Sequence, residues 1–244
     1  MKVLKNNTTF LIDDDNSCPN KSWWETNYPS WENFTFDILD KFSNIDGVLI
    51  DVGTYSGHIS LYAAQKYKKI YGFECDPIAY DCLQKNISIN NYNNIESHYN
   101  AVYKELTKIY VGGGIFRSEP APFGSSGIAI EGKEKETSNA ILCDTVVLSE
   151  FLEKNNIQNI SLIKMDIEGS ERFLAEDIVK INKKYKCPLY LSLHPHLMSK
   201  NEMQYLIDVF TSEYQYIYAE NFLLVDDIKN MGEYLFSNTK IDLK

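Results

Sequence analysis

The chain has 244 residues, 44% of them hydrophobic and 24% charged, which is typical of one large or two small globular domains. Its 24 Lys and Arg residues against 34 Asp and Glu residues give a formal net charge of −10. This charge argues against nucleic acid or an anionic lipid surface as the main partner, because both require clustered positive charge. No apolar run approaches the roughly 18 residues that a membrane span requires.

The five cysteines follow no metal-binding or redox spacing, and their odd number prevents complete pairing within the chain. The first 15 residues are too polar for a signal peptide. We therefore expect reduced thiols and a cytoplasmic protein. The cysteines are Cys18, Cys75, Cys82, Cys143 and Cys187.

The first 45 residues are rich in aromatic side chains and predict a helix over 29–42 that covers a sheet. From residue 46 onward, short apolar runs alternate with amphipathic segments. Strands are expected at 47–53, 69–74, 94–103, 106–111, 140–147, 160–165 and 188–193, with a closing hairpin at 214–219 and 222–225. Helices are expected at 57–67, 77–90, 149–155, 170–181 and 199–210.

Residues 112–139 break this alternation with three glycines, a Pro- and Ser-containing stretch and a charged stretch. A long segment of this kind inside a domain is typical of a functional loop, and we expect a loop insertion here that covers the site. The surrounding alternation predicts an α/β fold, with a mostly parallel, Rossmann-like sheet and helices on both faces. Ligands of such sheets bind beyond the carboxyl ends of the strands.

A glycine-containing turn, V-L-I-D-V-G-T-Y-S-G-H, follows the first strand of the repeat. Asp51 occupies the first glycine position of a dinucleotide-binding fingerprint, where a carboxylate would repel a pyrophosphate. A ligand with an amine near Asp51 and a carboxylate near the following helix fits better, and S-adenosylmethionine has both groups. Glu74 ends the next strand, where an acidic side chain binds ribose hydroxyls.

Three motifs together resemble the FkbM-type family of S-adenosylmethionine-dependent methyltransferases. They are I-D-V-G-T-Y-S-G-H, F-E-C-D-P at 73–77 and I-K-M-D-I-E-G-S-E at 163–171. The last keeps every fixed position of the family pattern, whereas Cys75 departs from its usual proline and Ser192 stands where relatives often have glutamate. The resemblance covers roughly 47–196.

The resemblance implies a class I methyltransferase fold, with a seven-stranded sheet that has one antiparallel strand near its edge. From its composition and pattern, the chain is expected to divide into an aromatic-rich N-terminal cap, 1–45, and a methyltransferase domain, 46–244. The resemblance also implies methyl transfer to a hydroxyl of a small molecule, with a saccharide or a nucleotide-linked sugar as the expected acceptor. The cofactor-binding residues expected on this basis are Asp51, Gly53, Thr54, Tyr55, Gly57, Glu74, Cys75, Asn100, Ala101 and Asp166.

The acceptor side is expected at Asp166, Glu168 and His194, which follow two neighbouring strands. A hydroxyl must lose its proton as it is methylated, and a histidine oriented by a carboxylate suits that role. The same three residues could instead hold a divalent metal, although their spacing does not require one. Trp23, Trp24, Tyr28 and Trp31 could stack on a ligand, but packing of the cap onto the sheet is the favoured interpretation.

Two other functions stay open on the sequence alone. An NAD-linked oxidoreductase would use the same architecture, but Asp51 disfavours it. A cofactor-binding module without catalysis would not need the polar residues at Asp166 and His194. The sequence does not define the oligomeric state.

Overall fold

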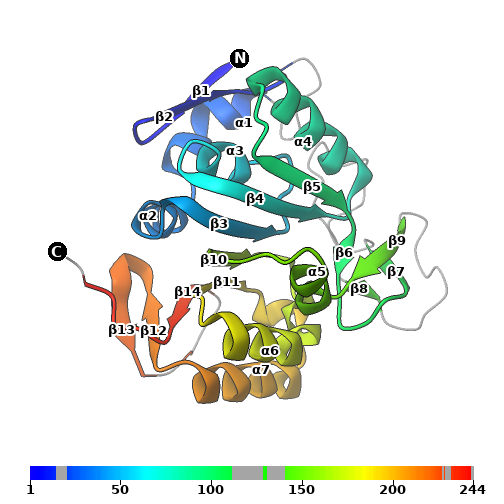
Figure 1. Ribbon diagram of the computed structural model, residues 1–244, viewed down its shortest axis with the longest axis vertical. Coiled ribbons are helices and arrows are strands. Elements are labelled where there is room, and N and C mark those ends of the chain that lie inside the picture. The colour runs from blue at the N-terminus through cyan, green and yellow to red at the C-terminus, as the bar shows by residue number, and fades with distance from the viewer. Residues whose placement is uncertain (15–20, 112–128, 131–140, 227, 229–231, 243–244) are drawn as a thin grey trace.

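A central eight-stranded sheet organises the computed structural model, which describes residues 1–14, 21–111, 129–130, 141–226, 228 and 232–242. The strand order is β13-β12-β14-β11-β10-β3-β4-β5. The five strands from β11 to β5 are parallel, whereas β14 runs antiparallel to both β11 and β12 (Figure 1). The strands are β3 (Asn44–Val52), β4 (Tyr67–Glu74), β5 (Ile95–Tyr99), β10 (Ile160–Met165), β11 (Leu189–Leu193), β12 (Tyr216–Ala219), β13 (Leu223–Val225) and β14 (Gly232–Ser237).

Helices cover both faces of this sheet, as expected. The α-helices are α1 (Lys21–Thr26), α2 (Asn33–Lys41), α3 (Ser60–Ala63), α4 (Pro77–Asn90), α5 (Leu148–Lys154), α6 (Ala175–Tyr185) and α7 (Lys200–Glu213). The 3₁₀ helices are η1 (Tyr28–Ser30), η2 (Ser170–Phe173), η3 (Pro195–Leu197) and η4 (Glu220–Phe222).

Because side chains alternate along each strand, the hydrophobic core forms two layers, one on each face of the central sheet. In β3, Val48, Ile50 and Val52 belong to the cluster that packs against α5, α6 and α7, whereas Leu49 belongs to the cluster with α2 and α3. Successive side chains of a strand point to opposite faces, so both faces of a central strand are apolar. This explains why the run from 48 to 52 is almost continuously hydrophobic, with Asp51 as its exception.

Two smaller sheets flank the central one. At the N-terminus, β1 (Lys2–Lys5) and β2 (Thr8–Leu11) form an antiparallel hairpin that sequence reasoning missed. Beyond β5, a four-stranded sheet has the order β6-β9-β7-β8 (Figure 1). Its strands are β6 (Ala101–Val102), β7 (Lys108–Val111), β8 (Ala129–Ile130) and β9 (Ile141–Val146).

The parallel part of the sheet and the hairpin of β12 and β13 confirm the expected α/β class I architecture, with two differences in detail. The sheet has eight strands rather than seven because β13 extends the edge beyond β12. The sequence reasoning also missed β14, which inserts antiparallel between β11 and β12. Without β13, the order matches the expected seven strands with one antiparallel member.

Local sequence explains where two helices begin. Asp76 caps α4: its carboxylate accepts hydrogen bonds from the backbone N–H groups of Ile78 and Ala79 at 2.8 and 3.1 Å, and Pro77 occupies the first helical position. The expected helix over 57–67 is wrong in extent, because α3 spans only Ser60–Ala63. Gly57 has φ +99°, a conformation that a right-handed helix does not allow.

The aromatic residues of the first 45 positions pack onto the glycine turn. Trp23, Trp24, Tyr28 and Trp31 surround the buried imidazole of His58, with ring centroids 4.6 to 6.0 Å from it. The packing interpretation of this cluster is therefore confirmed. The boundary at 45/46 stays a prediction, and the expected loop insertion at 112–139 lies almost wholly outside the described residues.

Lys5 fixes the N-terminal hairpin to this aromatic segment. Its ammonium group is buried and donates hydrogen bonds to the carbonyls of Tyr28, Pro29 and Trp31 at 3.3, 3.2 and 2.7 Å. It also donates to the Asn33 side chain at 2.8 Å. Burial lowers the pKa of Lys5, and the charges of Asp37 and Glu32 oppose that shift.

Candidate active site

The carboxyl ends of β3, β4, β10 and β11 meet at one edge of the central sheet, and the residues that follow them form the candidate site. A pocket that is open to solvent lies between the ends of β3 and β4 and the four-stranded sheet. It is lined by Val52, Gly53, Phe73, Glu74, Cys75, Asn100, Ala101, Val102, Ile109, Val111, Ile167 and Ser170.

Half of the expected cofactor residues line this pocket. They are Gly53, Glu74, Cys75, Asn100 and Ala101. The others, Asp51, Thr54, Tyr55, Gly57 and Asp166, are not among its lining residues. Sequence reasoning missed the apolar wall from Ile109 and Val111 of β7, although the alternation in K-I-Y-V was a usable signal.

Glu74 is a buried carboxylate held by three backbone N–H groups. Oε2 accepts from Tyr55 at 2.7 Å, and Oε1 accepts from Cys75 and Asp76 at 2.9 and 2.8 Å. Burial raises its pKa to about 7, although the backbone hydrogen bonds favour the charged form. A carboxylate has about four acceptor positions. Three of them accept these backbone hydrogen bonds, so the fourth can accept one from a ligand hydroxyl.

Asp51 forms a buried network rather than a pocket wall. Its Oδ2 accepts from the Ser60 hydroxyl at 2.6 Å, and its Oδ1 lies 3.5 Å from the ammonium group of Lys164. Lys164 also donates to the Gly53 carbonyl at 3.0 Å. Burial lowers the pKa of Lys164, but the charges of Asp51, Asp166 and Glu32 raise it above its ordinary value. The pair thereby fixes the position of the glycine turn.

The glycine turn approaches the chain after β10 too closely for any side chain. Gly53 has φ +80°, and a Cβ there would lie 2.0 Å from the Asp166 carbonyl oxygen. The backbone N–H groups of Gly53 and Thr54 both donate to the Phe73 carbonyl, at 3.0 and 3.1 Å. These two N–H groups therefore bind β4 rather than a ligand.

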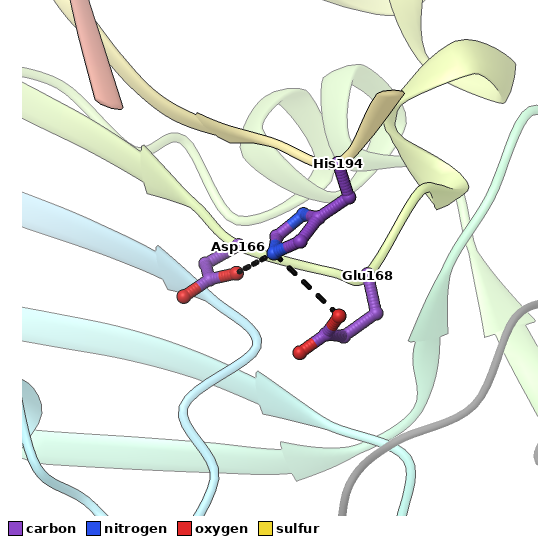
Figure 2. Close-up of side chains that lie close together, drawn as sticks. All are labelled: Asp166, Glu168 and His194. Carbon is purple, nitrogen blue, oxygen red and sulfur yellow. Dashed lines mark ion pairs between the residues drawn. The ribbon is translucent and has the colours of Figure 1, made fainter. Parts of the chain in front are cut away.

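Asp166, Glu168 and His194 do come together, as the sequence predicted (Figure 2). The His194 Nε2 atom lies 3.7 Å from Asp166 Oδ1 and 3.5 Å from Glu168 Oε2. Burial lowers the pKa of His194, but Glu171, Asp166 and Glu168 together raise it to about 9. The ring therefore carries a proton at neutral pH in the protein alone, and it can act as a base only after it loses that proton.

Glu171 lies on the opposite side of the His194 ring. Its Oε1 is 3.6 Å from Nδ1 and accepts a hydrogen bond from the Ile167 N–H at 3.0 Å. The side chain is fully buried, and its Oε2 has no hydrogen-bond partner among the described residues. The site residues expected from the sequence do not include Glu171, because its 23-residue separation from His194 hides this contact.

The backbone at Glu168 and Gly169, just after Asp166, adopts a left-handed conformation. Glu168 has φ +52°, and Gly169, which follows it, has φ +85°. A left-handed conformation is costly for a residue other than glycine and is found most often at functional sites. It turns the Glu168 side chain toward His194 rather than along the direction of β10.

Further carboxylates face Asp166 from neighbouring elements. Burial and the charges of Asp166 and Glu233 raise the pKa of Glu32 to about 8. Burial raises the pKa of Glu233 to about 7; a hydrogen bond with Tyr190 opposes that shift, and the charges of Asp166 and Glu220 add to it. The site is therefore strongly acidic, and it is built from β10, β11, β14 and the residue before α2.

The residues that line the pocket suit S-adenosylmethionine. The apolar lining, which includes Phe73, Val102 and Ile109, suits a flat adenine ring, and Glu74 would hold the ribose hydroxyls. Gly53 lines the same pocket at the end of β3. The described architecture and this pocket define a class I, S-adenosylmethionine-dependent methyltransferase.

The family is given by sequence comparison. The model of the methyltransferase FkbM domain matches residues 51–179, just over half of the chain. The chain therefore belongs to the FkbM methyltransferase family, and its cofactor is S-adenosylmethionine rather than NAD.

Individual relatives match over shorter stretches. An uncharacterized protein of Methanocaldococcus jannaschii is 43% identical over 60 residues, which are 25% of this chain and 23% of that protein. An uncharacterized RNA methyltransferase of Oceanobacillus iheyensis is 37% identical over 90 residues, 36% of this chain and 19% of that protein. The matched segments thus span about a fifth of these relatives.

Among solved structures, the methyltransferase FkbM of Methylobacillus flagellatus is similar at 17% identity and a TM-score of 0.46. The match covers 79% of this chain and 43% of that chain.

Within the described part of the chain, every helix is too short or too polar to cross a bilayer.

Proposed function

We propose that this methyltransferase transfers the methyl group to a hydroxyl oxygen of a small molecule, with a saccharide or a nucleotide-linked sugar as acceptor. The observation that carries the proposal is the Asp166–Glu168–His194 cluster, two members of which adjoin a pocket residue in sequence. Ile167, between the two carboxylates in sequence, lines that pocket. A hydroxyl held by the cluster would therefore lie next to the cofactor.

The cluster supplies what methylation of a hydroxyl demands. Bound S-adenosylmethionine provides an electrophilic methyl group and leaves as neutral S-adenosylhomocysteine. The acceptor oxygen forms the new bond to the methyl carbon while the bond from sulfur to carbon breaks, and the hydroxyl proton passes to Asp166, Glu168 or His194. Hydrogen bonds from sugar hydroxyls to Asp166 and Glu168 would orient the acceptor.

The acceptor class and the location rest on different supports. The saccharide comes from the family resemblance, and the net charge of −10 opposes a nucleic-acid acceptor. The cytoplasmic location rests on the cysteines, four of which are free in the described residues.

The test is S-adenosylhomocysteine formation with a panel of nucleotide sugars, glycosides and total RNA. We expect turnover with a saccharide and not with RNA. Asp166→Asn and His194→Gln should each lower kcat by about 10²- to 10⁴-fold, the usual contribution of a positioned acid or base. Their affinity for S-adenosylhomocysteine should match the parent's.

Glu150→Gln, which removes an exposed carboxylate on α5, is the matched control and should keep parental turnover. Methylation of RNA alone would contradict the acceptor class. Parental turnover in both cluster variants would show that the proton goes elsewhere.

A further inference from the structure

We infer that Asp166, Glu168 and His194 form a divalent-metal site, with Mn²⁺ or Mg²⁺ as the ion, and that the ion binds the acceptor hydroxyl. The second half of this inference rests on the proposed function, whereas the first does not. One oxygen from each carboxylate and the His194 Nε2 atom lie within 4.8 Å of one another (Figure 2). Small side-chain rotations would bring the three atoms to metal-bonding distances.

The orientation of the histidine supports a ligand role. Glu171 faces Nδ1 at 3.6 Å, which favours a proton on that nitrogen and leaves Nε2, which faces Asp166 and Glu168, as the nitrogen that would bind the ion. Metal-bound histidines usually have such a carboxylate behind the ring, where it fixes the tautomer and strengthens the ligand. Glu171 is fully buried with one oxygen unpaired among the described residues, so it is not a surface charge that happens to lie nearby.

The charge balance points the same way. The buried Glu171 carboxylate adds to the two ligand carboxylates around His194. Lys164 lies 3.9 Å from Asp166, but it is closer to Asp51 and donates to Gly53. A divalent cation among Asp166, Glu168 and His194 would neutralise this negative charge.

The donor set narrows the choice of ion. Two carboxylates suit Mg²⁺ and Mn²⁺, and a single imidazole nitrogen favours Mn²⁺ of these two. Three protein ligands leave coordination positions for water and for acceptor oxygens. A hydroxyl bound there would lose its proton more readily, which is the chemistry that the proposed methyl transfer needs.

The experiment measures Mn²⁺ binding to the full chain by calorimetry and by the loss of the free Mn²⁺ electron paramagnetic resonance signal, without cofactor or acceptor. We expect one ion per chain. Glu168→Gln and His194→Gln should abolish detectable binding, and Glu171→Gln should weaken it about 10- to 100-fold, as removal of a carboxylate behind a histidine ligand does. Glu150→Gln should bind like the parent.

Each variant is also tested for S-adenosylhomocysteine binding, which reports correct folding at the neighbouring pocket. No Mn²⁺, Mg²⁺ or Zn²⁺ binding by the parent would overturn the inference, as would parental Mn²⁺ affinity in Glu168→Gln or His194→Gln. Either result leaves methyl transfer by the carboxylates possible, so the two proposals fail separately. Mg²⁺ titrated against bound Mn²⁺ then shows which ion the site prefers.

Discussion

Replacing Glu74 by Gln should weaken S-adenosylhomocysteine binding about 10- to 100-fold. The variant removes the charged acceptor at the pocket rim but keeps the size of the side chain. Hydrogen bonds to a charged group are worth about 1.5–3 kcal/mol, and about 1.4 kcal/mol corresponds to a tenfold change in affinity. The Gln oxygen can still accept from Cys75 and Asp76, so the turn itself should persist.

The affinity of the parent should also depend on pH, because Glu74 has a pKa of about 7 in the free protein and binds ribose as the carboxylate. At pH 6 about a tenth of the molecules are ionised and at pH 8 about nine tenths, so affinity should rise about tenfold over this range. Glu74→Gln should remove this slope. Calorimetry at pH 6, 7 and 8 provides both measurements.

Protein stability should follow the opposite trend. The pKa of Glu74 is raised on folding from 4.5 to about 7, so the folded state takes up a proton between these values. The corresponding stabilisation is complete below pH 4.5 and is lost as the pH rises through 7. Glu74→Gln should reduce this loss in urea unfolding experiments.

Asp76→Asn is the matched control, because Asn also caps helices and the residue does not line the pocket. If Glu74→Gln binds as tightly as Asp76→Asn and keeps the pH slope, the ribose is held by another group. The assignment of Glu74 would then be refuted, whatever the outcome at the acceptor cluster.

Two further substitutions test how the site is supported. Gly53→Ala should lower the free energy of unfolding by about 2–5 kcal/mol, because it combines a left-handed backbone with a clash against the Asp166 carbonyl. Gly232→Ala is its control, since a Cβ there meets only ordinary contacts at 3.6 Å or more; equal stability of the two variants would argue against the close approach. Lys5→Ala should lower the free energy of unfolding by about 1–3 kcal/mol, because the carbonyls of Tyr28 and Trp31 lose their donor. Lys2→Ala, on the exposed face of β1, is its control and should change the free energy of unfolding little. Urea unfolding measures all four variants, and parental stability of Lys5→Ala would show that water replaces the ammonium group.

The parts of the fold that sequence predicted are those with a strong local signal. The apolar run before Gly53 predicts a buried parallel strand, and Asp76 with Pro77 marks the start of α4. The N-terminal hairpin was missed, although Asn6 at its turn adopts φ +48° and asparagine favours that conformation. The strand β14 was missed because its place between β11 and β12 depends on tertiary pairing.

The candidate site, like the fold, was predicted only where the sequence carries a local signal. Sequence predicted that Glu74, Asp166, Glu168 and His194 follow parallel strands, and the structure places Glu74 in the pocket and the other three together. Sequence assigned Asp51 to the methionine amine, whereas the structure shows the Asp51 carboxylate engaged with Lys164 and Ser60. Which neighbour a buried charged group contacts depends on distances between strands of the sheet. The sequence spacing along one strand does not give these distances.

The contacts of the glycine turn explain why the cofactor pocket and the acceptor cluster must keep a fixed separation. Gly53 abuts the Asp166 carbonyl, and Lys164 lies between Asp51 and Asp166. Tyr55, two residues after Gly53, donates to Glu74, which lines the pocket. The same short turn therefore contacts both the group assigned to the ribose and the group assigned to the acceptor. A displacement of even 1 Å between reacting groups can cost about a hundredfold in rate, so a rigid turn at this point serves methyl transfer directly.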